Sequence, residues 1–279
     1  MSLAVRITKV TPLVPNRVFV QWDILDPTEH GAYSFVLERS GSTEGPWETR
    51  ITSANTYYFV DNFQDQPTYP PTGNVNLYSL QREIYYRVKA IPPSGDHNAV
   101  YSSPHSLWPE IQYMASGLRR RLQYDESILF RRVNGVRLAL LKRRRWGERC
   151  TECYDPETKA TMWEACPTCY GTTFVGGYWS PVIIYGRIDP PHNVQVQPNG
   201  HGDTSETARH HITLLDTPSL QDKDIIVETD LNHRHVIEGH TQTELRRRSV
   251  HQQVTTSILD RGCVEYTILV DFRIIPPLL

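Results

Sequence analysis

The stretch RVFVQWDI, residues Arg17–Ile24, alternates between side chains that favour the protein interior and side chains that favour water. Successive side chains of an extended chain point to opposite sides, so Val18, Val20, Trp22 and Ile24 share one face. The pattern predicts a β-strand with one face buried in a core. We therefore expect a mainly β fold.

Four similar segments lie in the first hundred residues, and each is short and rich in β-branched or aromatic side chains. The turns between them draw on the 20 prolines and 16 glycines of the chain. Short strands at this spacing favour a Greek-key β-sandwich, which we place at residues 1–104. The segments are Val5–Val10, Tyr33–Ser40, Thr56–Asp61 and Glu83–Ala90.

The order of these segments resembles a fibronectin type III domain, one of the immunoglobulin-like sandwiches. The resemblance implies a binding or spacer module and not an enzyme. The chain departs from the family by a long insertion, Gln64–Ser79. The matching residues are Trp22, FVLER at Phe35–Arg39, the turn Gly41-Ser42 with Pro46-Trp47, and YYRVKA at Tyr85–Ala90.

Residues 105–149 have a different pattern, with apolar side chains at helical intervals from Ile111 to Leu129. We expect a basic helical linker, in which Asn134-Gly135 marks either a break between two helices or the tip of a hairpin. From Arg119 to Arg149 there are eleven Lys or Arg residues and three acids, a net charge of +8 in a chain whose total is −2. The basic residues are Arg119, Arg120, Arg121, Arg131, Arg132, Arg137, Lys142, Arg143, Arg144, Arg145 and Arg149.

This basic segment has two interpretations. It could contact nucleic acid, because clustered positive charge attracts phosphates. It could instead be a solvated helix face, or pair with acids on a neighbouring subunit. The sequence pI of 6.6 favours the second interpretation, since a dedicated nucleic-acid binder is usually more basic.

Four of the five cysteines form a CxxC-x12-CxxC pattern, at Cys150, Cys153, Cys166 and Cys169. Two such knuckles complete a closed tetrahedral shell of four sulfurs, which suits structural Zn²⁺ and leaves no open position for a substrate. The pattern predicts a zinc ribbon at residues 150–181, with two disulfides or four unligated thiols as the alternatives. Thiols in this spacing indicate a reducing compartment during folding. Cys263 is expected to be a buried strand thiol without chemistry.

Residues 182–279 contain a further series of strand-like segments, and Thr229–Asn232 has the position of a hairpin turn. Together they predict a small β-barrel of five or six strands. The segments are Pro181–Ile188, His210–Leu215, Asp224–Glu228, His233–Glu238, Arg248–Ile258 and Val264–Val270.

Two parts of the chain resemble proteins of tailed bacteriophages. The barrel is similar to connector and head-closure barrels through DIIV at Asp224–Val227, RHVI at Arg234–Ile237, VHQQV at Val250–Val254 and VEY at Val264–Tyr266. The cysteine region resembles the rubredoxin-like zinc ribbons of phage virion proteins through RRWGERC at Arg144–Cys150, CPTCYGT at Cys166–Thr172 and GGYW at Gly176–Trp179.

The phage resemblance implies a virion structural protein of the neck or connector type, folded in the host cytoplasm. Its expected partners are copies of itself in a homo-oligomeric ring, neighbouring virion proteins, and DNA passing through the ring. In this setting the zinc ribbon would fix the junction between the two β domains.

No GxSxG, HExxH, Walker or GxGxxG motif occurs in the chain, and no catalytic set can be assembled from the sequence. We therefore expect no enzyme activity, no catalytic residue and no organic cofactor. No apolar run approaches the ~20 residues that cross a bilayer, and the first residues lack signal-peptide features, so no membrane partner is expected. Two alternative functions remain: a nucleic-acid-binding zinc-ribbon protein that uses Arg119–Arg149, and a tail or baseplate component.

Overall fold

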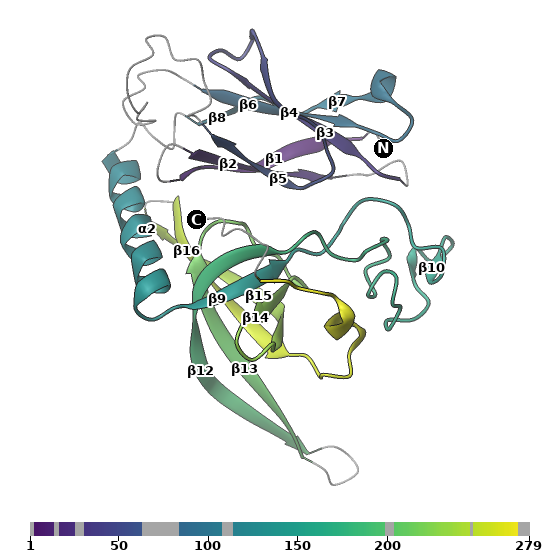
Figure 1. The fold of residues 1–279 in the computed structure, drawn as a ribbon, viewed down its shortest axis with the longest axis vertical. Coiled ribbons are helices and arrows are strands. Elements are labelled where there is room, and N and C mark those ends of the chain that lie inside the picture. The colour runs from purple at the N-terminus through teal and green to yellow at the C-terminus, as the bar shows by residue number, and fades with distance from the viewer. Residues whose placement is uncertain are drawn as a thin grey trace. The chain divides into compact units, whose positions relative to one another are not determined.

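The computed structural model describes residues 3–13, 17–25, 31–62, 84–107, 114–198, 204–245 and 248–272. The chain divides into two compact units, both rich in β-strands (Figure 1). The first unit comprises residues 1–117 together with 145–149. The second comprises residues 118–144 together with 150–279.

The first unit is a sandwich of two antiparallel sheets. One sheet has the strand order β1-β2-β5, and the other has the order β4-β3-β6-β7 with β8 also paired to β6. This division of the strands is that of a fibronectin type III domain, so the predicted sandwich is confirmed. The elements are β1 (Val5–Leu13), β2 (Arg17–Ile24), β3 (Ser34–Ser40), β4 (Glu48–Ala54), β5 (Tyr58–Asn62), β6 (Tyr85–Ile91), the short 3₁₀ helix η2 (Asp96–Asn98), β7 (Val100–Tyr101) and β8 (His105–Ser106).

Aromatic side chains from both sheets fill the core of the sandwich. Trp22 of β2 is buried against Phe35 of β3, with ring centroids 5.6 Å apart. Trp146, from the 145–149 segment of this unit, is also buried and meets the Phe35 ring edge-on at 6.1 Å. Rings of this size contribute large buried apolar areas, and the hydrophobic effect is the main favourable term in folding.

A charged network is buried in the same unit. The Asp61 carboxylate accepts hydrogen bonds from Arg39 at 2.7 Å, from Arg50 at 2.8 Å and from the Tyr86 hydroxyl at 2.9 Å. Arg39 also donates to Glu48 at 2.9 Å. Burial raises the pKa of Tyr86, and the Asp61 charge raises it further, so the phenol stays protonated and remains a donor. Pairing these charges internally avoids the large cost of a buried charge without a partner.

The second unit is a closed β-barrel with the strand order β12-β13-β16-β15-β14-β9. Neighbouring strands are antiparallel, and β9 closes the barrel by pairing with β14 on one side and β12 on the other. The predicted small barrel is therefore confirmed, with six strands. They are β9 (Val136–Leu141), β12 (Val182–Pro198), β13 (Thr204–Leu215), β14 (Ile225–Glu228), β15 (Arg234–Leu245) and β16 (Arg248–Ile258).

One face of the barrel wall carries an apolar cluster, against which Tyr170 of the ribbon and Leu259 and Ile268 of the segment after β16 are packed. Its members in the strands are Ala139, Leu141, Ile183, Ile225 and Val227, and Tyr178 joins them. The strand members come from β9, β12 and β14, which are adjacent around the barrel wall. Antiparallel pairing puts their side chains opposite one another across the strands. The two arms β12–β13 and β15–β16 continue well beyond this cluster (Figure 1).

The helix α2 (Met114–Arg132) precedes the barrel and packs on it through a mixed face. Gln123 donates to the buried Asp216 carboxylate at 2.7 Å, the Glu126 carboxylate lies 3.2 Å from the His251 ring, and Phe130 is buried. The predicted helix is thus confirmed over the α2 range. Within the described residues, no helix is both long and apolar enough to span a membrane.

Two secondary-structure predictions are wrong in this unit. Residues 136–141, expected to continue the helical linker, form strand β9 of the barrel. Leu138 to Leu141 are all buried, so β9 lacks the alternation of a strand with one wet face. The hairpin alternative at Asn134-Gly135 is also wrong, because this pair joins a helix to a strand.

The expected strand at Val264–Val270 is instead the 3₁₀ helix η3 (Val264–Thr267) followed by irregular chain. The buried Arg234 guanidinium donates to the carbonyl oxygens of Glu265, Tyr266 and Ile268. These carbonyls therefore need no neighbouring strand. Cys263 lies just before η3 and is partly exposed, so the prediction of a buried strand thiol is wrong. The insertion Gln64–Ser79 lies outside the described residues.

Candidate functional site: a four-cysteine metal centre

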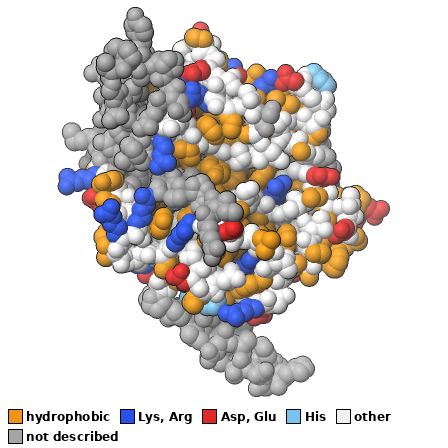
Figure 2. All heavy atoms as spheres, in the orientation of Figure 1, with side chains coloured by type: hydrophobic (Ala, Val, Ile, Leu, Met, Phe, Trp, Pro, Cys, Tyr) orange, Lys and Arg blue, Asp and Glu red, His pale blue; other side chains and the backbone are white. Residues whose placement is uncertain are grey.

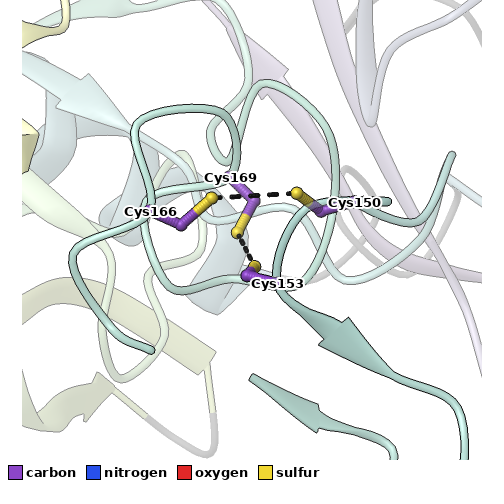
Figure 3. Close-up of side chains that lie close together, drawn as sticks. All are labelled: Cys150, Cys153, Cys166 and Cys169. Atoms are coloured by element: carbon purple, nitrogen blue, oxygen red, sulfur yellow. Dashed lines mark hydrogen bonds between the residues drawn. The ribbon is translucent and has the colours of Figure 1, made fainter. Parts of the chain in front are cut away.

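The four predicted cysteines converge on one point. Cys150, Cys153, Cys166 and Cys169 are buried, their sulfur atoms all lie within 4.8 Å of one another, and their side chains point toward a common centre (Figure 3). Cys150 Sγ and Cys166 Sγ are 3.8 Å apart, and Cys153 Sγ and Cys169 Sγ are 3.0 Å apart. None of the four forms a disulfide.

The cluster is compact enough for one metal ion to be bound by all four thiolates, although the 3.0 Å between Cys153 and Cys169 is shorter than a tetrahedral zinc site requires. A tetrahedron with Zn–S distances near 2.3 Å has S–S edges of about 3.8 Å, which matches the Cys150–Cys166 pair. Burial raises the pKa of the Cys153 thiol, because desolvation disfavours the thiolate, and raises that of Cys169 as well. A cation is what offsets this cost in a buried cluster of thiolates. The cluster can therefore bind a metal ion such as zinc.

In the second knuckle, backbone N–H groups point at the sulfur atom of Cys166. Burial acts to raise the pKa of Cys166, but backbone N–H groups of Cys169 and Thr168 donate to the sulfur, and the net pKa is lowered. The N–H of Tyr170 donates to the Cys166 carbonyl at 2.8 Å, which closes the turn. This is the geometry expected of a metal knuckle, in which amides stabilise a thiolate.

Two glycines with positive φ allow the tight turns of the chain after the second knuckle. Gly171, two residues after Cys169, has φ of +67°, a conformation that favours glycine. Gly177 has φ of +60°, and a Cβ there would lie 2.7 Å from the Cys169 carbonyl oxygen. Only glycine fits both the conformation and the space at Gly177.

The ribbon is joined to the barrel by the residues expected to be a free basic run. Arg143 donates to the Gly171 carbonyl at 3.1 Å and forms an isolated antiparallel bridge with Tyr178. The Arg144 guanidinium lies 4.3 Å from the Trp179 ring centroid and donates to the Tyr178 carbonyl at 3.2 Å. Burial lowers the pKa of Arg144. These arginines are part of the packing of the second unit.

Two aromatic residues at the C-terminal end of the ribbon, Tyr178 and Trp179, pack against other parts of the second unit. Tyr178 belongs to the apolar cluster on the barrel wall, and Trp179 stacks with Arg144. The ribbon and the barrel therefore share an apolar contact.

A buried ion pair lies at the end of β9, where the chain leaves the barrel and runs toward the ribbon. Lys142 donates to the fully buried Asp224 at 2.7 Å and to the Ser219 carbonyl at 2.9 Å. Asp224 also accepts the backbone N–H of Arg143 and of Gln221, each at 2.9 Å. One carboxylate thus ties the end of β9, the loop before β14 and the start of the ribbon together.

Sequence reasoning missed Lys142 and Asp224 as structural residues. Lys142 was counted with the basic segment, and Asp224 was read only as part of a strand. A signal was present: each charge stands directly beside a fully apolar run, LALL at Leu138–Leu141 and IIV at Ile225–Val227. Two opposite charges, each directly next to one of two buried strands, are candidates for pairing with each other inside the protein.

The barrel also contains a buried histidine, His235, next to the half-buried His210. The rings of His210 and His235 are 5.4 Å apart and edge-on, and His235 Nδ1 lies 3.4 Å from the Thr256 hydroxyl. Burial lowers the pKa of His235 to about 4, with further lowering from His210 and His233. Among the described residues, the cysteines are the one set of three or more potential ligands close enough for a metal.

Comparisons with known proteins add little to this geometry. No protein-family model and no curated protein matches the chain. Among solved structures, a fibronectin type III-like protein from Clostridium thermocellum matches 38% of this chain and 84% of its own length, with 19% identity and a TM-score of 0.24. The sandwich assignment rests on the strand order of the first unit rather than on that match.

Proposed function

We propose that the chain is a structural component of a tailed-phage particle, at the neck or connector, in which copies form a ring and zinc has a structural role. The observation that carries the structural role is the closed cysteine cluster. All four sulfurs face one another, so a tetrahedral ion bound there has no free position for a substrate. The proposal assigns no catalytic residue and no organic cofactor.

The placement on a particle is supported by the combination of parts in one chain. A fibronectin type III-like sandwich, a four-cysteine ribbon and a closed six-stranded barrel occur together, and the last two resemble phage virion parts. The long arms β12–β13 and β15–β16 give the barrel extended edges with which neighbours could pair. A tail or baseplate position has the same requirements and differs in location on the particle.

The experiment that tests this proposal has two parts. Metal analysis of the purified chain should give about one zinc per chain, and sedimentation or mass photometry should give one closed oligomer of fixed size. Antibodies against the chain should then label one position on purified particles from the source phage. A monomer at all concentrations, or labelling of no particle, would overturn the proposal.

Nucleic-acid binding is the second candidate, and exposed arginines favour it. Arg121, Arg131, Arg132 and Arg145 are exposed, whereas Lys142, Arg143 and Arg144 have the internal contacts described above. The structure therefore directs the test to the exposed set. If this function is correct, replacing Arg121, Arg131 and Arg132 with Gln should remove about three phosphate contacts. DNA retention should then be weaker, and its dependence on salt concentration should be less steep. Unchanged retention would overturn it.

A further inference from the structure

The helix α2 carries an exposed apolar stripe. Leu118, Leu122 and Leu129 are four and seven residues apart, and this spacing places them on one face of the helix, with Val133 directly after its last residue. They remain exposed, from 38% for Leu122 to 73% for Val133. The face of α2 that packs on the barrel, with Gln123, Glu126 and Phe130, lies beside this stripe. The helix therefore has a second face that is apolar and unused within the second unit.

The tip of the ribbon carries a second exposed apolar surface. Met162 and Trp163 follow the small hairpin β10 (Tyr154–Asp155) and β11 (Ala160–Thr161), and they are 66% and 50% exposed. A zinc ribbon needs neither side chain for its buried cluster, which consists of the four cysteines. Trp and Met are enriched at protein–protein interfaces, and Trp is a frequent hot-spot residue.

The two surfaces have opposite charge. Residues 150–166 of the ribbon contain four acids and one lysine, a net charge of −3, and Glu152, Glu157 and Glu164 are exposed. The α2 range contains five arginines and two acids, a net charge of +3, and Arg121 and Arg132 are exposed beside the stripe. Figure 2 shows blue side chains with orange ones over α2, and red with orange at the edge that carries β10. Charge complementarity of this kind steers association and selects the partner.

We propose that the ribbon tip of one copy docks on the α2 stripe of a second copy of this chain. The helix and β10 lie at opposite edges of the second unit, so they pair between chains (Figure 1). The contact joins two different surfaces, and such a contact repeats from copy to copy until the rotation closes a ring. Trp163 and Met162 enter between Leu118, Leu122 and Leu129, and the flanking acids and arginines fix the register. This inference rests on the ring of the proposed function and names the surfaces that form it.

The test uses the full-length, zinc-loaded chain and two variants on exposed residues. The tip variant carries M162Q and W163Q, and the face variant carries L122Q and L129Q. Each variant alone should need at least a tenfold higher concentration than the wild type to reach half assembly in sedimentation or mass photometry. Mixed in equal amounts, they should form a heterodimer of about 64 kDa, twice the 32.2 kDa chain, and nothing larger. Each then supplies the surface that the other lacks.

A matched control and a charge swap separate docking from folding. The control L231Q changes an apolar residue that is 57% exposed outside both surfaces, and it should assemble like the wild type. Lysines at positions 157 and 164 (E157K, E164K) should weaken assembly. Adding R121E and R132E to the same chain should restore it, because both charges are then reversed. Zinc content and circular dichroism equal to the wild type confirm that each variant is folded.

The outcomes distinguish this inference from the proposed function. Assembly of the wild type together with unchanged assembly of both variants overturns the docking pair and leaves the ring. Absence of the heterodimer in the mixture also overturns the pair, since the intact tip of one variant then fails to bind the intact face of the other. A wild type that stays monomeric at every concentration overturns both the pair and the ring.

Discussion

The barrel and the ribbon belong to one unit but are stabilised by different means. The barrel buries Ala139, Leu141, Ile183, Ile225 and Val227 in a cluster of apolar side chains. The buried cluster of the ribbon consists of its four cysteines. A segment this short cannot supply enough apolar area to offset the entropy of ordering it. The barrel therefore depends on the hydrophobic effect, and we expect the ribbon to depend on a metal bound by its cysteines.

Loss of the metal should have the largest effect. In C166S or after chelation, the ribbon should lose its zinc and unfold, because structural zinc contributes about 10–16 kcal/mol in small metal domains. The barrel strands should remain folded. Metal analysis and limited proteolysis check this, with new cleavage expected within residues 150–177.

The matched control is C263S, which changes the one cysteine outside the cluster. It should keep one zinc per chain and the protease resistance of the wild type. Full zinc and full protection in C166S would show that the four sulfurs do not act together.

Breaking the buried ion pair should have the next largest effect. In D224A, the buried Lys142 ammonium loses its carboxylate, and the N–H groups of Arg143 and Gln221 lose their acceptor. Leaving a buried charge unpaired costs about 3–5 kcal/mol. Denaturant unfolding should show this loss in the barrel transition.

The matched control is D189A, because Asp189 pairs with the exposed Arg187 at 2.8 Å. An exposed pair contributes about 0–1 kcal/mol, so D189A should be nearly neutral. Equal losses of unfolding free energy in D224A and D189A would show that burial does not set the cost of breaking an ion pair in this protein.

Acid should destabilise the barrel through the histidine pair. Burial lowers the pKa of His235 to about 4 in the folded state, against an unfolded value near 6.5. Above about pH 6.5 the ring is neutral in both states, and its contribution is complete. As the pH falls from about 6.5 to 4, the unfolded chain binds the proton first, and about 3 kcal/mol of stability is lost.

Unfolding measured between pH 7 and 4 checks this prediction. H235Q should flatten the fall in stability, because glutamine does not titrate. H97Q changes an exposed histidine of η2 and should leave the fall unchanged. If stability falls as steeply with pH in H235Q as in the wild type, the fall comes from titratable groups other than His235.

The smallest expected effect concerns the turn after the second knuckle. In G177A, the added Cβ meets the Cys169 carbonyl oxygen at 2.7 Å in a backbone with φ of +60°. A left-handed conformation costs an L-residue about 1–2 kcal/mol, so the ribbon should bind zinc more weakly. Competition with a zinc chelator measures this. G262A, which adds a methyl in open space, should bind zinc like the wild type.

The parts of the fold that the sequence predicts well are local patterns. Strand β2 has the predicted bounds, Arg17–Ile24, because its alternation matches one buried face. The convergence of the four cysteines was also predicted correctly, because CxxC spacing sets the distance between two sulfurs without help from the rest of the fold. In both cases the structure depends on neighbours in sequence.

The errors arise where distant residues decide the structure. Strand β9 is buried on both faces between β12 and β14, so its leucines carry no period that distinguishes a strand from a helix. The apolar segment at Val264–Val270 is not a strand, because Arg234 binds its carbonyls from more than 30 residues away. The basic run predicts charge, but the partners of Arg143 and Arg144 appear only once the ribbon is folded.

The pairing of β9 with β12 makes the ribbon the loop of a hairpin. Residues 142–181 connect Leu141 to Val182, and residues 150–169, between the outer cysteines, are half of this loop. The entropic cost in free energy of closing a flexible loop falls by about 0.6 kcal/mol each time the loop length is halved. Zinc that binds before the strands pair should therefore speed the pairing of β9 with β12 roughly threefold. We therefore expect a metal bound at the cysteine cluster to influence how fast the barrel closes.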